Sequence, residues 1–356
     1  MLRTENQLYK EDLKYSLSLP LPWEKLNGKT LLITGATGTI GTYLIDLLML
    51  LAQEKNISLK VIAMARNQKR FEERFSQYLN NDKLQFLCHD VNQSFSDIEN
   101  IKCDYLFHFA SNTHPVSYAT EPINTILTNV IGLNNLLDFA SKTQGSRFIY
   151  ASSVEIYGEN RGDAEKFTED YCGFIDCNTL RAGYPEGKRT GEALCQAYIS
   201  QKNLDIVIPR LSRIYGATML ESDSKVASQF IKNAVNKNDI VLKSDGSQFY
   251  SYTYIADAIN AILYCMFLGE KGNAYNIAGS DVHLKELAQS LADIAQTQVK
   301  FELPEATEKA GFSKTTRGVM DSSKLTKLGF TFHYDLQSGL ERTLSILKDL
   351  QLFQEA

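Results

Sequence analysis

The sequence predicts an α/β protein in which a doubly wound parallel sheet is followed by a smaller C-terminal α/β lobe. From residue 29 onwards, short apolar runs alternate with stretches of helical periodicity, as in a parallel sheet covered by helices on both faces. Three glycines at intervals of three residues, Gly35, Gly38 and Gly41, follow the first apolar run. After residue 216 the pattern becomes irregular, which indicates a second, mixed lobe.

The same alternation predicts the individual elements. Strands are expected at 30–34, 60–65, 84–88, 105–110, 147–152 and 205–211. Helices are expected between them at 42–55, 67–79, 123–143 and 185–202. Further helices are expected near 224–236 and 254–268 and from residue 282. Because parallel strands are connected by crossover helices, this order predicts a parallel sheet.

The segment from residue 35 to residue 41 has the spacing of a dinucleotide-binding turn between a strand and a helix. Gly35 lets the chain turn, Gly38 lets the backbone approach a pyrophosphate, and Gly41 lets the helix pack close to the strand. The phosphates then lie at the helix N-terminus, where free N–H groups favour an anion. We therefore expect a Rossmann-type domain that binds NAD or NADP through Gly35, Thr37, Gly38, Thr39, Ile40 and Gly41.

Three segments follow from these patterns. Residues 1–28 carry a broken helical pattern that Pro20 and Pro22 stop, and we expect this leader to dock on the core. Residues 29–216 form the expected dinucleotide-binding domain and carry the catalytic residues. Residues 217–356 form mostly a substrate-binding lobe, with some segments returning to the large sheet.

Composition and charge exclude several function classes. The 356 residues carry a net charge of −5, which argues against nucleic acid as the main partner. Charged residues flank each apolar run, so no membrane-spanning segment is expected, and the N-terminus lacks the apolar core of a signal peptide. The six cysteines and five histidines show no zinc-ligand spacing, so no metal is expected. These features predict a cytoplasmic enzyme.

A catalytic constellation is expected around Tyr184 and Lys188, which lie one helical turn apart on the same helix face. A lysine there stabilises a phenolate and can also hydrogen-bond a cofactor ribose. Ser153 leaves the carboxyl end of a preceding strand, where its hydroxyl can share a substrate proton with Tyr184, and Glu155 follows it. The alternative is a surface Tyr–Lys pair, a serine that ends a strand and a solvated loop acid.

These residues and several further motifs resemble the extended short-chain dehydrogenase/reductase family, the nucleotide-sugar epimerases, dehydratases and decarboxylases. The resemblance runs from about residue 28 to about residue 347. Besides the glycine turn, the motifs that carry it are His108-Phe-Ala110-Ser111, Asn129-Val-Ile-Gly132, Ser153-x-Glu155-x-Tyr157-Gly158, Tyr184-x-x-x-Lys188, Pro209-Arg210-x-x-Arg213-Ile-Tyr215-Gly216 and Ala274-Tyr-Asn-Ile-Ala278.

The resemblance implies a role for each matching residue. Ser153, Tyr184 and Lys188 match the family's catalytic triad. Further cofactor contacts are implied for Asp90 and Val91 at the adenine, for Ala110 and Ser111 along the cofactor, and for Asn129, which would buttress the active-site helix. The implied substrate is a sugar linked to a nucleoside diphosphate.

Departures from the family pattern bear on the reaction. The 4,6-dehydratases have an Asp-Glu pair where this chain has Val154 and Glu155, so ordinary dehydration is not expected. The decarboxylases keep the serine-x-glutamate pattern, but the family usually has an arginine, which contacts substrate phosphates or a carboxylate, where Tyr250 stands. Arg213 replaces a usual asparagine. It either supplies the missing charge to the substrate or is a buried structural arginine, and both interpretations stay open.

The choice between NAD and NADP depends on Arg66. NAD-preferring sites place an acid at the end of the second strand, whereas this strand ends at Arg66, with Lys69 and Arg70 beyond it. A basic residue there favours the 2′-phosphate of NADP. An arginine can also stack on the adenine in enzymes that use NAD.

Three functions are compatible with these features. The first is an epimerase or decarboxylase that transiently oxidises a nucleotide-linked sugar and returns the hydride. The second is a net reductase that consumes NADPH, and the third is a non-catalytic dinucleotide-sensing module.

A homodimer is also expected. Family members pair the helices near 123–143 and 185–202 across a twofold axis. The apolar residues expected in this interface, some of which could instead face the sheet, are Ile126, Val130, Leu133, Leu194 and Tyr198.

Overall fold

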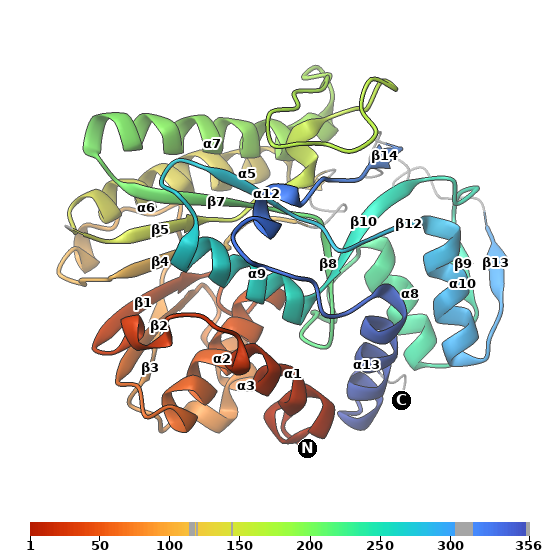
Figure 1. Cartoon of the computed structure of the whole chain (residues 1–356), viewed down its shortest axis with the longest axis horizontal. Coiled ribbons are helices and arrows are strands. Elements are labelled where there is room, and N and C mark those ends of the chain that lie inside the picture. The colour runs from red at the N-terminus through yellow and green to blue at the C-terminus, as the bar shows by residue number, and fades with distance from the viewer. Residues whose placement is uncertain (114–117, 119, 144, 303–315, 354–356) are drawn as a thin grey trace.

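The computed structural model describes residues 1–113, 118, 120–143, 145–302 and 316–353. Within these residues a large sheet stands beside a smaller lobe (Figure 1). The strands of the large sheet are β1 (Lys29–Thr34), β2 (Leu59–Ala65), β3 (Leu84–Cys88), β4 (Tyr105–His108), β5 (Arg147–Tyr150), β7 (Asp205–Leu211) and β11 (Ala274–Ile277). They run in the order β11-β7-β5-β4-β1-β2-β3 with parallel pairings, and β6 (Ser152–Ser153) pairs with β7. The predicted fold class is confirmed.

Helices cover both faces of this sheet. They are α2 (Thr39–Glu54), α3 (Gln68–Arg74), α5 (Pro122–Leu127), α6 (Leu133–Ser141), α7 (Gly183–Lys202) and α9 (Ile255–Leu268). Successive strand residues point to opposite faces. Leu31 and Ile33 of β1 therefore pack in one buried cluster with residues of α2 and α9, whereas Leu32 packs in a second cluster with residues of α6 and α7. The sheet order reverses between β1 and β4, which places a topological switch point beside the glycine turn.

The smaller lobe is built from two short sheets and the helices packed on them. Its strands are β8 (Arg213–Tyr215), β9 (Ile240–Leu242), β10 (Phe249–Tyr254), β12 (Ser280–His283), β13 (Val299–Phe301) and β14 (Arg317–Gly318). Its helices are α8 (Val226–Val235), α10 (Leu284–Ala295) and α13 (Leu336–Asp349). Between β10 and β12 the chain returns to the large sheet as α9 and β11. After β14 it passes through the short helix α12 (Ser323–Thr326), which packs against β11 and α9.

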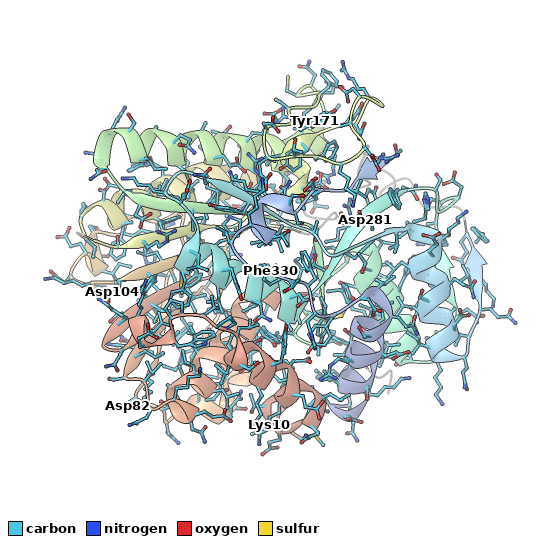
Figure 2. The ribbon with its side chains drawn as sticks, viewed as in Figure 1. Lys10, Asp82, Asp104, Tyr171, Asp281 and Phe330 are labelled. Atoms are coloured by element: carbon cyan, nitrogen blue, oxygen red, sulfur yellow. The ribbon has the colours of Figure 1, made fainter. Side chains whose placement is uncertain are left out.

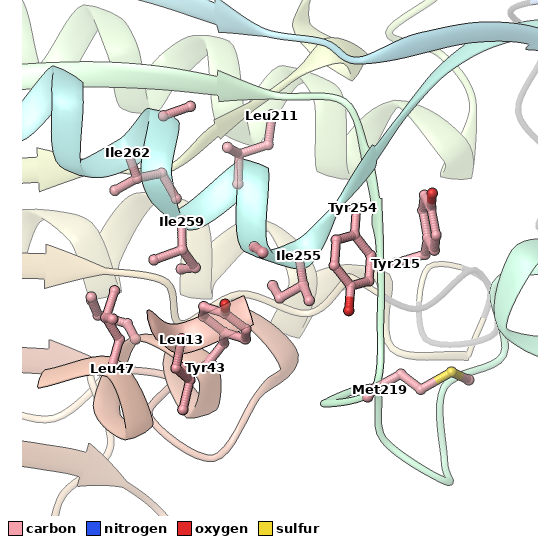
Figure 3. Close-up of a cluster of buried hydrophobic side chains, with 14 of the residues drawn as sticks. Leu13, Tyr43, Leu47, Leu211, Tyr215, Met219, Tyr254, Ile255, Ile259 and Ile262 are labelled. Atoms are coloured by element: carbon pink, nitrogen blue, oxygen red, sulfur yellow. The ribbon is translucent and has the colours of Figure 1, made fainter. Parts of the chain in front are cut away.

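The N-terminal residues pack between the two parts of the molecule. Helix α1 (Gln7–Ser18) contacts α2, α9 and α13, and the flanking 3₁₀ turns are η1 (Arg3–Glu5) and η2 (Trp23–Leu26). Figure 3 shows Leu13 of α1 in one buried cluster with Tyr43 of α2 and Ile255 of α9. Buried Asp12 accepts hydrogen bonds from Tyr254, Tyr334 and Arg342, so helix α1 joins the core of the large sheet to the smaller lobe.

Short turns complete the path around the site. These are η3 (Ser76–Tyr78), η4 (Ser96–Ile98), the π-helical η5 (Thr128–Gly132), η6 (Val154–Tyr157) and η7 (Leu180–Ala182). The loops after η6, marked by Tyr171 in Figure 2, project above the N-terminal end of α7. Among the described residues, no helix combines the length and the apolar character that crossing a membrane requires.

Candidate active site

The glycine turn joins β1 to α2 and leaves a cradle of open backbone groups. Gly35 adopts φ +65°, and a Cβ there would lie 2.8 Å from the backbone nitrogen of Ala110. A Cβ at Gly41 would lie 2.6 Å from the Gly35 carbonyl oxygen, so both positions require glycine. Gly38 is the N-cap of α2 and offers no capping side chain, which leaves the first N–H groups of α2 free for a phosphate. This geometry fits a dinucleotide pyrophosphate. Thr37 is buried within the turn, and Thr39 and Ile40 begin the helix.

The residues expected at the adenine end lie at the ends of β2 and β3. These strands pair side by side, with Ala65 opposite Cys88. As a result Arg66 Nη1 lies 3.7 Å from Asp90 Oδ2. The Arg66 side chain is 61% exposed and can therefore turn towards a ligand. Val91 is buried beside Gly132, where a Cβ would lie only 2.8 Å from the Val91 side chain.

Asn129 occupies the π-helical turn η5, behind helix α7. Its Nδ2 donates to the Thr125 carbonyl (2.8 Å), and its Oδ1 accepts from the Ser111 hydroxyl (2.9 Å). A Cβ on Gly187 would lie 3.1 Å from the Asn129 Cβ, so the glycine allows α7 to pack closely here. Asn129 therefore connects Ser111, which follows β4, to the helix that carries Tyr184.

Tyr184 and Lys188 lie on the buried face of α7. Lys188 Nζ donates to the Ala151 carbonyl (2.8 Å) and lies 6.0 Å from the centre of the Tyr184 ring. Burial lowers the pKa of Lys188 to about 8. Burial also raises the pKa of Tyr184 to about 12, although a hydrogen bond with Ser153 works against this rise. Ser153, Tyr184 and Lys188 are thus brought together in the protein.

Glu155 lies between two arginines. Arg181 Nη2 donates to Glu155 Oε2 at 2.9 Å, and Arg213 Nη2 lies 4.0 Å from Glu155 Oε1. The Glu155 backbone N–H donates to the Ser153 hydroxyl (3.3 Å), which holds the two residues next to each other. Arg213 also places its guanidinium carbon 3.3 Å from the centre of the Tyr250 ring. The two candidate substrate-binding residues therefore contact each other, and one of them reaches Glu155.

A small cavity of about 40 Å³ adjoins Glu155, with Glu159, Asp176 and Arg181 in its lining. This volume has room for a water molecule. The Glu155 side chain therefore borders a cavity that can hold water, on the side of the loops that precede α7.

The sequence analysis missed two side chains at the site, Arg181 and Tyr118. The Tyr118 and Tyr184 rings stack with their centres 5.0 Å apart, and the Arg181 guanidinium lies 4.6 Å from the centre of the Tyr118 ring. Arg181 could have been found, because it lies three residues before Tyr184 and hence on the same side of the helical turn. Tyr118 has no such signal in the sequence.

A second group that the sequence did not predict lies behind the strand end that carries Ser153. Glu192 of α7 accepts from the Ser152 hydroxyl (2.5 Å) and from Arg210 Nε and Nη2 (3.0 and 2.6 Å). These bonds tie β6, β7 and α7 together. They hold the strand end from which Ser153 projects.

Comparison with known proteins agrees with this geometry. The sequence model of the NAD dependent epimerase/dehydratase family matches residues 31–278. UDP-glucuronic acid decarboxylase 1 of Danio rerio is 30% identical over 319 residues, which is 89% of this chain and 72% of that protein. UDP-glucuronic acid decarboxylase 6 of Arabidopsis thaliana is 29% identical, over 81% of this chain and 82% of that protein.

Two solved structures share the fold. The first is dTDP-glucose 4,6-dehydratase (DesIV) of Streptomyces venezuelae with NAD and TYD bound, with a TM-score of 0.78, 22% identity, and coverage of 92% of this chain and 99% of that chain. The second is UDP-glucuronic acid 4-epimerase of Bacillus cereus in complex with UDP-glucuronic acid and NAD, with a TM-score of 0.76, 21% identity, and coverage of 90% and 99%. The family match and the curated relatives confirm the resemblance inferred from the motifs. The chain belongs to the NAD dependent epimerase/dehydratase family of enzymes.

Proposed function

We propose that the protein is an NAD-dependent decarboxylase of a uronic acid linked to a nucleoside diphosphate, such as UDP-glucuronic acid. The observation that carries this proposal is the placement of Glu155 between Arg181 and Arg213, directly beside Ser153 and Tyr184. The Glu155 carboxylate faces both guanidinium groups, and Arg213 adds a positive charge on the side of Glu155 away from its hydrogen bond with Arg181. An acidic sugar would supply a negative charge for Arg213. The curated relatives reported above are UDP-glucuronic acid decarboxylases, which supports the same choice.

Arg213 is the residue that we assign to the substrate's anionic group. Its Nη1 is buried and has no hydrogen-bond partner among the described residues. A buried donor without a partner destabilises the protein, and a carboxylate or phosphate oxygen would remove that cost. Contact with the Tyr250 ring holds the guanidinium in place. The unpartnered nitrogen favours the substrate-binding interpretation of Arg213 over the structural one.

The proton transfers are assigned to the side chains that the fold brings together. Tyr184, hydrogen-bonded to Ser153, accepts the proton of a sugar hydroxyl. Lys188 is positioned for a ribose hydroxyl of the cofactor and for support of the phenolate. The chemistry that bound NAD supplies is the reversible acceptance of a hydride from the sugar carbon. The residues assigned to hold it are those of the glycine turn, with Arg66, Asp90, Val91, Ala110, Ser111 and Asn129.

Oxidation at the carbon two positions from the carboxylate gives a β-keto acid, which loses carbon dioxide readily. The remaining enolate needs a proton at the carbon that lost the carboxylate. Glu155 is assigned to that proton, because it lies beside Ser153 and next to a cavity with room for water. Return of the hydride then gives a nucleotide-linked pentose, so the overall reaction consumes no cofactor.

The proposal is tested by incubating the purified protein with UDP-glucuronic acid and no added cofactor. We expect carbon dioxide and a nucleotide-linked pentose, with Tyr184→Phe inactive. An isomer of unchanged mass would instead indicate an epimerase. Stoichiometric oxidation of added NADPH would indicate the net reductase, for which Arg66 is the supporting residue. Failure to turn over any nucleotide sugar would favour the dinucleotide-sensing module.

We further propose that two copies associate through α5, η5 and α7. Four apolar side chains on the first two elements are 43–73% exposed, namely Ile123, Ile126, Leu127 and Ile131. Leu133, the first residue of α6, is fully buried in the core cluster against the sheet, as the alternative for these apolar residues allows. Light scattering at micromolar concentration should give a molar mass twice that of one chain. For the Ile123→Glu variant the mass should fall to that of a single chain. The cytoplasmic location stays a prediction.

A further inference from the structure

Three side chains at the active site form a layered stack. The guanidinium of Arg181 lies 4.6 Å from the centre of the Tyr118 ring, and that ring lies 5.0 Å from the Tyr184 ring at an interplanar angle of 26°. Tyr118 and Tyr184 are each 6% exposed, and the Arg181 side chain is 12% exposed. The cation and the catalytic tyrosine therefore both contact the same buried aromatic ring.

The same guanidinium also holds Glu155. Its Nη2 donates to Glu155 Oε2 at 2.9 Å, and the carboxylate is largely buried. Turn η7 leads directly into α7, so the backbone of Arg181 and that of Tyr184 belong to one rigid segment. Arg181 thus contacts Glu155, the proposed proton donor, directly. It reaches Tyr184, the proposed proton acceptor, through the ring of Tyr118.

We propose that Arg181 is a positioning residue of the reaction, which fixes the Glu155 carboxylate and, through Tyr118, prepares Tyr184 for proton transfer. This inference rests on the proposed function for the roles of Glu155 and Tyr184. The groups that face Tyr184 among the described residues are Ser153, Glu155, Arg181, the Lys188 ammonium and the hydroxyls of Tyr118 and Tyr150. Of these, the charge of Arg181 lowers the tyrosine's pKa, whereas Glu155 raises it.

The hydrogen bonding of Arg181 differs from that of Arg189, a structural arginine two turns further along on α7. Arg189 donates through Nε to the Ile156 carbonyl (2.5 Å) and through Nη2 to the Gly173 carbonyl (2.6 Å), and its Nη1 lies 3.6 Å from Glu186. Arg181 instead keeps Nε and Nη1 buried with no hydrogen-bond partner among the described residues. Unpartnered buried donors reduce stability, so the two on Arg181 are a cost that the satisfied contacts of Arg189 avoid. Its placement is explained by the two reacting groups that it faces.

The test compares Arg181→Met with Arg189→Met in the NAD-loaded protein, measuring the pH dependence of kcat for the acidic nucleotide sugar. For Arg181→Met we expect the acidic limb of the profile to move up by roughly one pH unit, with about a tenfold lower rate below it. KM and NAD affinity should stay within about threefold of wild type. Arg181→Lys should recover part of the shift. Arg189→Met should lower the melting temperature and leave the profile unmoved.

Two results would overturn the inference. One is a slower Arg181→Met enzyme with an unmoved profile. The other is a defect confined to KM, which would make Arg181 a substrate-binding residue instead. Tyr118→Leu should shift the profile in the same direction because it removes the ring, whereas Tyr118→Phe should leave it close to wild type.

A second measurement separates this inference from the proposed function. The ionisation of Tyr184 is followed by ultraviolet difference spectra between NAD-loaded wild type and Tyr184→Phe, and the same pair is compared in the Arg181→Met background. We expect the Tyr184 pKa to rise by about one unit when Arg181 is removed. This readout needs no turnover, so it still decides the role of Arg181 if no acidic sugar is decarboxylated. An unchanged Tyr184 pKa would refute the coupling through Tyr118.

Discussion

The guanidinium of Arg213 lies flat against Tyr250, 3.3 Å from the centre of the ring, and reaches to within 4.0 Å of Glu155. These two residues stand where the family pattern has asparagine and arginine. Strands β8 and β10 pair in parallel, with Arg213 opposite Tyr252, so a side chain from β8 can cover its neighbour on β10. Arg213 therefore places a cation directly over the side chain that stands at the family's usual arginine position.

Exchanging the side chains of Arg213 and Tyr250 tests whether substrate binding needs a positive charge at this part of the site, whichever of the two strands carries it. Arg213→Asn should raise KM for UDP-glucuronic acid about ten- to a hundredfold, since a charge-assisted hydrogen bond contributes roughly 1.5–3 kcal/mol. Adding Tyr250→Arg to that variant should recover most of the affinity. If the double variant binds no better than Arg213→Asn, the guanidinium of Arg213 has a structural role instead.

Removal of Lys188 and removal of the Tyr184 hydroxyl should have different effects. Lys188→Ala should weaken NAD binding and reduce the rate, because the ammonium serves both the ribose and the tyrosine. Tyr184→Phe keeps the ring stack with Tyr118 and loses only the hydroxyl, so it should reduce the rate and leave NAD binding nearly unchanged. Fluorescence titration with NAD on both variants measures this. An equal loss of affinity in the two would make Tyr184 a structural residue.

The expected preference between the two dinucleotides depends on what Arg66 contacts. If it binds a 2′-phosphate, the wild type should prefer NADPH to NADH by about ten- to a hundredfold, and Arg66→Asp should reverse the order. The carboxylate of Asp90 lies 3.7 Å from Arg66 and would repel a 2′-phosphate bound to that arginine. The measurement therefore shows which of the two charges has the larger effect. Equal or tighter binding of NADH by the wild type would assign Arg66 to the adenine. The net-reductase alternative would then lose its main support.

Buried Asp257 should make stability depend on pH. Burial raises its pKa to about 7, although its carboxylate accepts from the backbone N–H groups of His333 and Tyr334. The folded protein holds this proton more tightly than the unfolded chain does, where an aspartate has a pKa of about 4. The contribution to the free energy of unfolding is therefore complete below about pH 4 and is lost as the pH rises through about 7. It amounts to at most about 4 kcal/mol.

Urea unfolding of wild type and Asp257→Asn between pH 5 and 8 isolates this contribution, because the variant lacks the titrating group. The wild type should lose more stability over that range than the variant does. Asp335→Asn serves as the control. It removes a nearby helix-capping carboxylate whose pKa is lowered by Ser338, and the wild-type decline should persist in it. Parallel curves for wild type and Asp257→Asn would contradict the prediction.

The sequence predicted correctly those parts of the structure that depend on residues close together in the chain. The turn from Gly35 to Gly41 and the spacing of Tyr184 and Lys188 are local requirements of a tight turn and of one helix face. Predicted strand positions agree with the observed ones for the same reason, since β1 and β2 are continuous apolar runs.

Contacts between distant segments could not be predicted in this way. Tyr118 stacks on Tyr184 although the two lie far apart in the sequence, and no local pattern encodes that contact. The π-helical turn that places Asn129 was read as ordinary helix, because a single extra residue in a turn leaves the apolar period almost unchanged. Glu192 was overlooked because a glutamate on a helix is usually solvated, and its partner Arg210 lies on a strand.

The hydrogen bond between Asp12 and Arg342 spans 330 residues of chain. During synthesis the aspartate therefore leaves the ribosome long before the arginine that neutralises it, and at ordinary elongation rates the interval is on the order of 15–70 s. Until then the surface of α1 that later covers α13 stays open. Formation of α13 thus completes this junction, and a chain interrupted before Arg342 leaves Asp12 with its tyrosine donors but without the cation that balances its charge.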